Sequence, residues 1–156
     1  MSKIEARLAE LGMALPAVTK PVAAYVPAVV TGNLVFTSGQ LPMVDGAMAA
    51  TGKVGDRDGL VSPETAKELA RTCALNALAA AASVIGSLDR VTRVVKVVGF
   101  VASDPAFTGQ PAVINGASEF LSEVFGDIGA HARSAVGVAT LPLDTAVEVE
   151  LILEFA

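Results

Sequence analysis

The chain has 156 residues, the size of one domain of about 100–150 residues, with 11 basic and 16 acidic residues and a formal net charge of −5. Hydrophobic residues make up 53 % and charged residues 17 %, which excludes a disordered chain, because such chains are rich in charge and poor in apolar residues. A single cysteine and a single histidine exclude a disulfide framework and any metal site built from several cysteines or imidazoles.

Neither nucleic acid nor a membrane is an expected partner. The basic residues do not cluster into the footprint that a nucleic-acid backbone requires. Residues 21–44 form the longest uncharged stretch, but its three prolines and its turn at 31–33 would leave backbone groups unsatisfied in lipid. The first ten residues lack the apolar core of a signal peptide. We therefore expect a soluble, cytoplasmic protein.

The first third of the chain predicts a short helix followed by a hairpin. Apolar residues recur at helical spacing in residues 2–11. Residues 25–30 and 34–37 are β-branched and aromatic runs, and the turn signal at 31–33 predicts that they pair as a hairpin. Residues 39–59 contain five glycines and predict an irregular segment.

The rest of the chain predicts two long helices and three strands. Ser62 is a suitable cap and Pro63 a suitable first residue for a helix that ends at Gly86. The elements that follow are a strand at 91–101, a helix at 111–125, a strand at 132–141, a turn at 142–145 and a strand at 146–155. The nearly continuous valines of 91–101 predict a strand that is buried on both faces.

This element order predicts an α+β fold whose second sheet face meets solvent or a partner. Two helices cannot cover both faces of the sheet, so they are expected to pack on one. With 28 alanines and 22 valines among so few charges, we favour association with further copies of the chain. The alternative is an alanine-rich composition inherited from a GC-rich genome.

Arg133 is the most conspicuous polar residue, because it lies among alanines and valines in a predicted strand. A guanidinium there needs an anionic partner, either a glutamate or a ligand. Glu148 would lie on the neighbouring strand if residues 142–145 turn the chain back. From charge pattern alone, an Arg133–Glu148 ion pair without chemistry is favoured. A catalytic triad would need His131 with a remote serine, and no nucleophile motif surrounds one.

Four segments together resemble the Rid/YjgF family of imine and enamine deaminases, which also carries the label endoribonuclease L-PSP. They lie in the family's order and cover residues 22–155. The segments are Tyr25-Val26-Pro27-Ala28-Val29, Gly32-Asn33-Leu34-Val35-Phe36-Thr37-Ser38-Gly39-Gln40-Leu41-Pro42, Ala132-Arg133-Ser134, and Leu141-Pro142 with Val147-Glu148-Val149-Glu150. The Ser-Gly-Gln-Leu-Pro segment followed much later by Ala-Arg-Ser is a specific combination.

The resemblance implies a chorismate-mutase-like fold in a homotrimer with ligand clefts between subunits. Residues 1–156 would form one such domain, with 1–20 as an N-terminal helical extension. The implied activity is hydrolysis of 2-aminoacrylate and related imines to 2-keto acids and ammonia, with no cofactor and no metal. The implied partner is therefore a small carboxylate-bearing imine or keto acid.

The same resemblance implies roles for individual residues. Arg133 would bind the substrate carboxylate, and Glu148 would position or activate the attacking water. The substrate-binding residues would be Tyr25, Ser38, Gly39 and Asn115, together with His131 and Ala135 at positions where this chain departs from the family.

The departures indicate a divergent branch whose substrate is open. His131 replaces the usual proline, Ala135 the common cysteine, and Gly137 an acidic residue, while the tyrosine usual after the asparagine is missing and Gly116-Ala117-Ser118 follows Asn115 instead. On an extended chain His131 would share a face with Arg133 and could add a second donor for an anion. The favoured interpretation of His131 is a solvent-facing residue at the strand entrance. Cys73 is interpreted as an inert core residue.

Three other functions remain as alternatives. One is hydrolysis of a related small molecule, and another is a non-catalytic, regulatory module that binds small carboxylates through Arg133. The third is ribonuclease activity or inhibition of translation, which the acidic charge balance disfavours.

Overall fold

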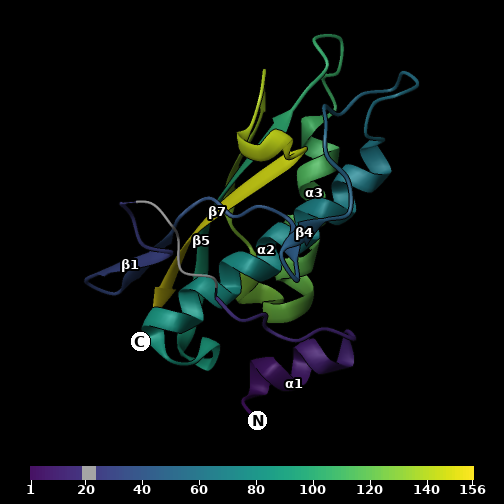
Figure 1. Cartoon of the computed structure of the whole chain (residues 1–156). Coiled ribbons are helices and arrows are strands. Elements are labelled where there is room, and N and C mark those ends of the chain that lie inside the picture. The colour runs from purple at the N-terminus through teal and green to yellow at the C-terminus, as the bar shows by residue number, and fades with distance from the viewer. Residues whose placement is uncertain (19–23) are drawn as a thin grey trace.

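The computed structural model describes residues 1–18 and 24–156 (Figure 1). Its helices are α1 (Lys3–Glu10), α2 (Pro63–Ile85) and α3 (Gln110–Phe125), with short 3-10 turns η1 (Leu88–Arg90), η2 (Gly126–Gly129) and η3 (Pro142–Asp144). Its strands are β1 (Ala28–Thr31), β2 (Leu34–Thr37), β3 (Met43–Val44), β4 (Ala47–Met48), β5 (Val91–Ala102), β6 (Ala132–Val138) and β7 (Val147–Phe155). The order and type of the main elements agree with the sequence prediction.

Five of the strands form one mixed sheet in the order β1-β2-β7-β5-β6. Only the β5–β6 pair is parallel, and α3 supplies its crossover connection. Helices α2 and α3 pack together on one face of the sheet (Figure 1). The predicted α+β fold with both main helices on one face is therefore confirmed.

The prediction that Glu148 lies on the strand next to Arg133 is wrong. Strand β5 lies between β6 and β7, because it pairs in parallel with β6 on one side and antiparallel with β7 on the other. The segment at 142–145 does turn the chain back, but β7 returns on the far side of β5.

Local signals explain where the helices begin and end. The Ser2 hydroxyl accepts the Glu5 N–H at 3.1 Å, and the Glu5 carboxylate accepts the Ser2 N–H at 3.0 Å, which caps α1. Both carboxylate oxygens of Asp89 accept backbone N–H groups at the start of α1, at 2.8 Å each, and these bonds lower the pKa of Asp89. The Ser62 hydroxyl accepts a backbone N–H in the first turn of α2, and Gly86 ends α2 with φ +86°.

The first strand begins later than the sequence predicts, at Ala28 rather than residue 25. Pro27 has no N–H to donate to a ladder, so regular pairing starts after it. The turn of the hairpin is as expected, with Gly32 at φ +58°.

Strand β5 is buried on one face only, which corrects the prediction of burial on both. Val94, Val97 and Val101 are fully buried against the helices, whereas Val98 and Phe100 on the other face are half-exposed. The two helices cover one side of the sheet and no element covers the other in the described chain. We call that side the open face; its apolar residues include Val29, Phe36, Val98, Phe100, Val136 and Ile152.

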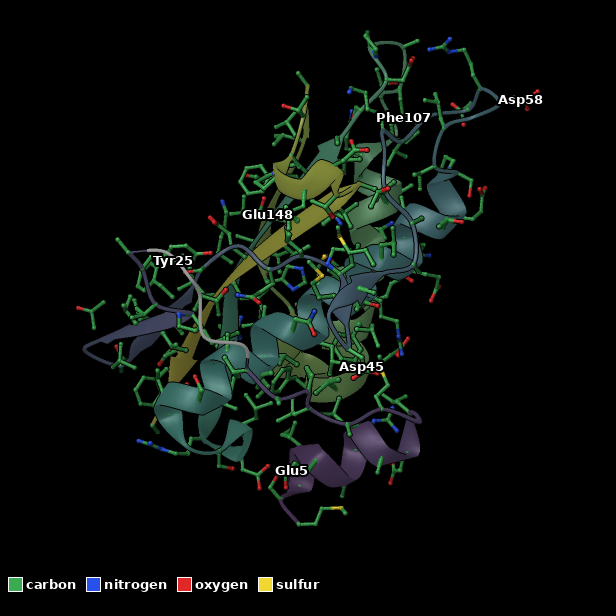
Figure 2. All side chains as sticks on the ribbon, viewed as in Figure 1. Glu5, Tyr25, Asp45, Asp58, Phe107 and Glu148 are labelled. Carbon is green, nitrogen blue, oxygen red and sulfur yellow. The ribbon has the colours of Figure 1, made fainter. Side chains whose placement is uncertain are left out.

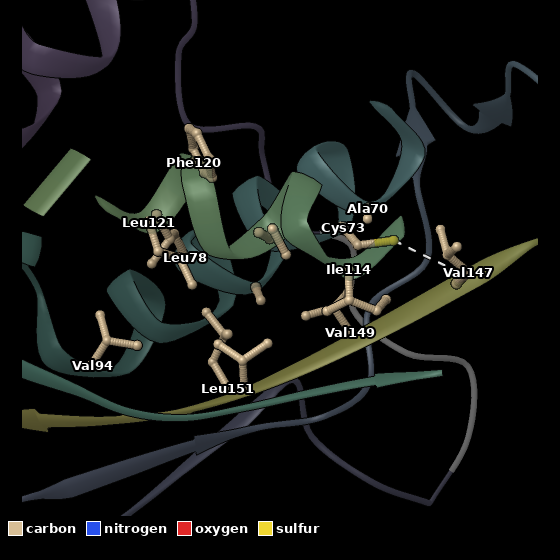
Figure 3. Close-up of a cluster of buried hydrophobic side chains, with 14 of the residues drawn as sticks. Ala70, Cys73, Leu78, Val94, Ile114, Phe120, Leu121, Val147, Val149 and Leu151 are labelled. Carbon is tan, nitrogen blue, oxygen red and sulfur yellow. Dashed lines mark hydrogen bonds between the residues drawn. The ribbon is translucent and has the colours of Figure 1, made fainter. Parts of the chain in front are cut away.

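The core lies between the sheet and the two long helices (Figure 3). Its largest side chains include Leu78, Ile114 and Phe120. Cys73 is fully buried among them, as predicted, and burial raises the pKa of its thiol. Helix α2 is long and apolar enough to cross a membrane, but it packs against α3 and β7 as the central core helix.

Candidate functional site

The candidate residues fall into two groups that lie apart in one chain. The Glu148 group contains Tyr25, Ser38, Gly39 and Glu148, and it gathers where the end of β2 meets β7. The Arg133 group contains Asn115, Ser118, His131, Arg133 and Ala135, and it gathers where β6 meets α3.

In the Glu148 group, the side chain of Glu148 lies directly against the backbone of Gly39. Glu148 projects from the open face of β7, opposite Phe100 of β5. A Cβ atom at Gly39 would overlap the Glu148 carboxylate, so only glycine permits this approach. The segment is held in place because Gln40 and Val149 exchange backbone hydrogen bonds of 2.8 and 3.1 Å.

The environment of Glu148 favours its protonated form. Burial raises the pKa of Glu148, and the negative charge of Glu150 on the same face raises it further. A half-buried carboxyl group with a raised pKa suits proton transfer near neutral pH better than an ordinary surface glutamate.

Ser38 attaches the Tyr25 segment to this group. Its hydroxyl donates to the Val26 carbonyl at 2.6 Å, and its N–H donates to the Pro27 carbonyl at 2.8 Å. Tyr25 is exposed, and Figure 2 labels it together with Glu148. Tyr25 therefore belongs to the surface around Ser38 and Gly39, but no hydrogen bond joins it to Glu148 within the described residues.

In the Arg133 group, α3 holds one side of the guanidinium. Arg133 Nη1 donates to Asn115 Oδ1 at 2.7 Å and to Ser118 Oγ at 3.3 Å, and Nη2 donates to the Pro111 carbonyl at 3.3 Å. Among the ion pairs of the described residues, none involves Arg133. The predicted ion pair between Arg133 and Glu148 is thus wrong, and the guanidinium has only neutral partners there.

The sheet itself keeps the two groups apart. Arg133 is in register with Val97 and, through it, with Leu151, on the face that the helices cover. Glu148 is three residues away from Leu151 and projects from the open face. The two positions are two strand spacings apart across the sheet and three residues apart along the strands. Each of these separations is about 10 Å. A single chain cannot place both residues on one small substrate.

His131 is engaged on both sides of its ring, unlike the solvent-facing residue that we predicted. Nδ1 lies 2.6 Å from the Gly129 carbonyl, and Nε2 lies 2.8 Å from Ser118 Oγ. Neither nitrogen is therefore directed at a position beside Arg133 where an anion would bind. From the sequence, Ser118 is only a departure from the family pattern; its contacts with both His131 and Arg133 arise from the packing of α3 beside β6 and leave no local signal in the chain.

The Arg133 group also contains Ala135 and borders a surface hollow. Ala135 follows Arg133 by two residues on the same face of β6 and offers only its methyl group. A surface hollow of about 430 Å³ lies beside the group, lined by Ser118, Glu119, Ser122, Glu123 and His131. In the described part of the chain, no three histidine, cysteine, aspartate or glutamate side chains gather closely enough to hold a metal ion.

Comparison with known proteins decides the family. A family model described as "YjgF/chorismate mutase-like, putative endoribonuclease" matches residues 5–155. The chain belongs to this family. Membership confirms the resemblance that the motifs indicated, and it accounts for the arrangement of sheet and helices.

Three relatives show how far the likeness extends. The protein TCP17 of Trypanosoma cruzi is 44 % identical over 153 residues, which cover 97 % of this chain and 94 % of TCP17. The crystal structure of Atu1372, a protein of unknown function from Agrobacterium tumefaciens, is 45 % identical with a TM-score of 0.88, covering 98 % and 93 % of the two chains. Escherichia coli TdcF with bound serine is 25 % identical with a TM-score of 0.62, covering 88 % and 92 %.

Proposed function

We propose that this member of the YjgF family hydrolyses small, carboxylate-bearing imines of the 2-aminoacrylate type to 2-keto acids and ammonia. The observation that carries the proposal is Arg133, a guanidinium that neutral groups of α3 hold in place and that no carboxylate of the described chain neutralises. Such a group is suited to bind a substrate carboxylate with two parallel hydrogen bonds.

In the proposed reaction, Glu148 acts on water while Arg133 holds the substrate. The ionised Glu148 takes a proton from the water as the water oxygen bonds to the imine carbon, and it then gives that proton to the nitrogen, which yields a carbinolamine. Glu148 next passes the proton of the carbinolamine hydroxyl group to the same nitrogen, so that the C–N bond breaks, ammonia leaves and the carbonyl of the keto acid forms. Arg133 holds the substrate carboxylate throughout and takes no part in these proton transfers.

The reaction requires that two copies of the chain form each site. The Arg133 group of one copy and the Glu148 group of another would face each other across a cleft. The apolar open face, on which Glu148 lies, offers the surface for this association. A homotrimer with clefts between subunits is the assembly that we propose. The TdcF structure with bound serine supports a ligand of this size and charge in a relative.

Coupled turnover tests the proposal. A pyridoxal-phosphate dehydratase generates 2-aminoacrylate from serine, and pyruvate release is followed with and without this protein. We expect faster release with the wild type and none of that acceleration with Arg133→Ala. Arg133→Lys should also fail, since an ammonium group cannot form the two-pronged contact. No acceleration by a correctly folded oligomer would exclude 2-aminoacrylate as the substrate, and bulkier imines would be tested next.

A non-catalytic carboxylate-binding protein is the second candidate, because the same Arg133 geometry would serve it. Such a protein would gain thermal stability when pyruvate binds, but it would release no ammonia from imines.

Ribonuclease activity is named in the family description, and the net charge of −5 disfavours it. A ribonuclease would bind RNA with an affinity that falls steeply as the salt concentration rises.

The cytoplasmic location expected from the sequence stays a prediction.

A further inference from the structure

Ser118 and His131 contact each other beside Arg133. Ser118 on α3 and His131 before β6 are 13 residues apart in sequence, and Ser118 Oγ lies 2.8 Å from His131 Nε2. The same oxygen lies 3.3 Å from Arg133 Nη1. We propose that Ser118 and His131 are positioning residues that orient the Arg133 guanidinium for a ligand carboxylate.

The direction of the hydrogen bonds follows from the acceptor at the far end. The Gly129 carbonyl only accepts, so Nδ1 of His131 carries the hydrogen of that 2.6 Å contact. In the neutral ring Nε2 is then an acceptor, and the Ser118 hydroxyl donates to it. This leaves the lone pairs of Ser118 Oγ for the N–H of Arg133. The chain of bonds therefore runs from Arg133 through Ser118 and His131 to the backbone at Gly129.

The chain of bonds engages the Nη1 side of the guanidinium and leaves the Nε–Nη2 edge available to a ligand. Nη1 is occupied by Asn115 and Ser118, and only one weak contact, to the Pro111 carbonyl, engages Nη2. Within the described residues no acceptor bonds to Nε. The Nε–Nη2 edge is a planar pair of donors that matches the two oxygens of a carboxylate. The ligand carboxylate is therefore expected to bind at this edge.

The inference deepens the proposed function and rests on it for the identity of the ligand. Its physical content is independent, since it concerns how Arg133 is held before any ligand arrives. A group that is already oriented loses less conformational freedom on binding, which raises affinity without adding a contact to the ligand.

The first test measures the fixed geometry without a ligand. In nitrogen-15 spectra, the only histidine of the chain should show a neutral form with the hydrogen on Nδ1. The two terminal nitrogens of Arg133, assigned with Arg133→Lys, should give separate signals because rotation of the group is hindered. Ser118→Ala should merge these two signals, whereas Ser83→Ala, on the exposed side of α2, should leave them separate. Separate signals in Ser118→Ala would overturn the inference.

The second test measures carboxylate binding by calorimetry with pyruvate. Ser118→Ala and His131→Ala should each raise Kd by about two- to tenfold, the effect of one lost hydrogen bond. The double variant should be no weaker than Ser118→Ala, because both residues act through the same chain of bonds. Ser118→Thr keeps the hydroxyl and should restore most of the affinity, and Ser83→Ala should bind as the wild type does.

The outcomes separate the inference from the proposed function. Equal pyruvate affinity in the wild type and Ser118→Ala overturns the inference and leaves imine hydrolysis intact. If the wild type does not bind pyruvate but Ser118→Ala still merges the Arg133 signals, the positioning role stands and the proposed ligand is wrong. Covalent labelling of Ser118 by a fluorophosphonate would show a nucleophile instead, and would overturn a purely positioning role.

Discussion

Glu148 and Gly39 depend on each other because the carboxylate occupies the space that a side chain at residue 39 would need. The backbone of Gly39 does not have a positive φ, so alanine is conformationally permitted there. What prevents a side chain at this position is the neighbouring carboxylate alone. The pair shows how the identity of one residue determines the position of another that is 109 residues away in sequence.

Gly39→Ala is therefore expected to displace the Glu148 carboxylate. We expect a loss of stability of about 1 kcal/mol or less, because the clash falls on the end of a flexible side chain that can move, and turnover at least tenfold lower. Urea unfolding and the coupled assay measure the two effects. In a Glu148→Ala background, which empties the space, Gly39→Ala should cost almost no stability. An equal cost in both backgrounds would show that the clash lies elsewhere.

Glu148 also makes a pH-dependent contribution to stability. Burial raises its pKa in the folded state, so folding favours the protonated carboxyl. That contribution is fully present below the pKa of the unfolded chain, and it is lost as the pH rises through the folded-state pKa. Glu148→Gln remains neutral at every pH, so the variant should be more stable than the wild type at pH 7.

The stability difference between Glu148→Gln and the wild type should shrink as the pH falls to about 4, where the wild type is protonated as well. Urea unfolding at the two pH values measures it, with Glu68→Gln on the exposed side of α2 as the matched control for removing one carboxylate. A difference that does not change with pH would mean that burial of the charge is not its cause.

Turnover of Glu148→Gln in the coupled assay should fall by about 100-fold or more, the usual effect of losing a proton-transfer group.

At the scale of the elements, the close crossing of α2 and α3 determines where the Arg133 group lies. Gly116 of α3 packs on the backbone of α2, and a Cβ there would overlap the Lys67 carbonyl oxygen. The small residues Ala70, Ala74 and Ala77 of α2 are likewise fully buried. Because Asn115 and Ser118 flank this contact on α3, the helix crossing holds both side-chain acceptors of Arg133 in place.

Gly116→Ala should destabilise the protein, although helix propensity alone predicts that alanine stabilises it. In an exposed helix, replacing glycine by alanine stabilises by about 1 kcal/mol. Here the added methyl group meets backbone, and we expect a loss of about 1–3 kcal/mol in urea unfolding. Ser122→Ala, on the exposed side of the same helix, should change stability by about 0.5 kcal/mol or less. A stabilised Gly116→Ala would mean that the helices move apart at little cost.

At the scale of the whole molecule, the sheet places the two groups on different faces, and in the proposed function an assembly would bring them together. The helices cover the face from which Arg133 projects, while Glu148 and the apolar residues Val98 and Phe100 share the open face. A site formed between neighbouring copies explains both the separation of the groups and the exposed apolar surface.

Mixed oligomers test this arrangement. Arg133→Ala and Glu148→Gln should each be inactive alone. An oligomer that contains both variants should have some clefts in which the Glu148→Gln chain supplies Arg133 and the Arg133→Ala chain supplies Glu148. We expect activity to return when the variants are unfolded, mixed and refolded together, up to about a quarter of the wild-type level for random assembly. The control refolds each variant alone. Failure to recover activity in mixed oligomers of confirmed composition would place both groups in a site within one chain.

The sequence by itself determined the helices, most strand positions and the family of this protein. Caps such as Ser62, helix ends such as Gly86 and the alternation of β7 are local signals, which act between residues a few positions apart. The tertiary structure alone decided that β5 separates Arg133 from Glu148 and that His131 contacts Ser118. These features depend on which strands pair and how α3 crosses over, and pairing over long sequence separations leaves no periodic trace in the chain.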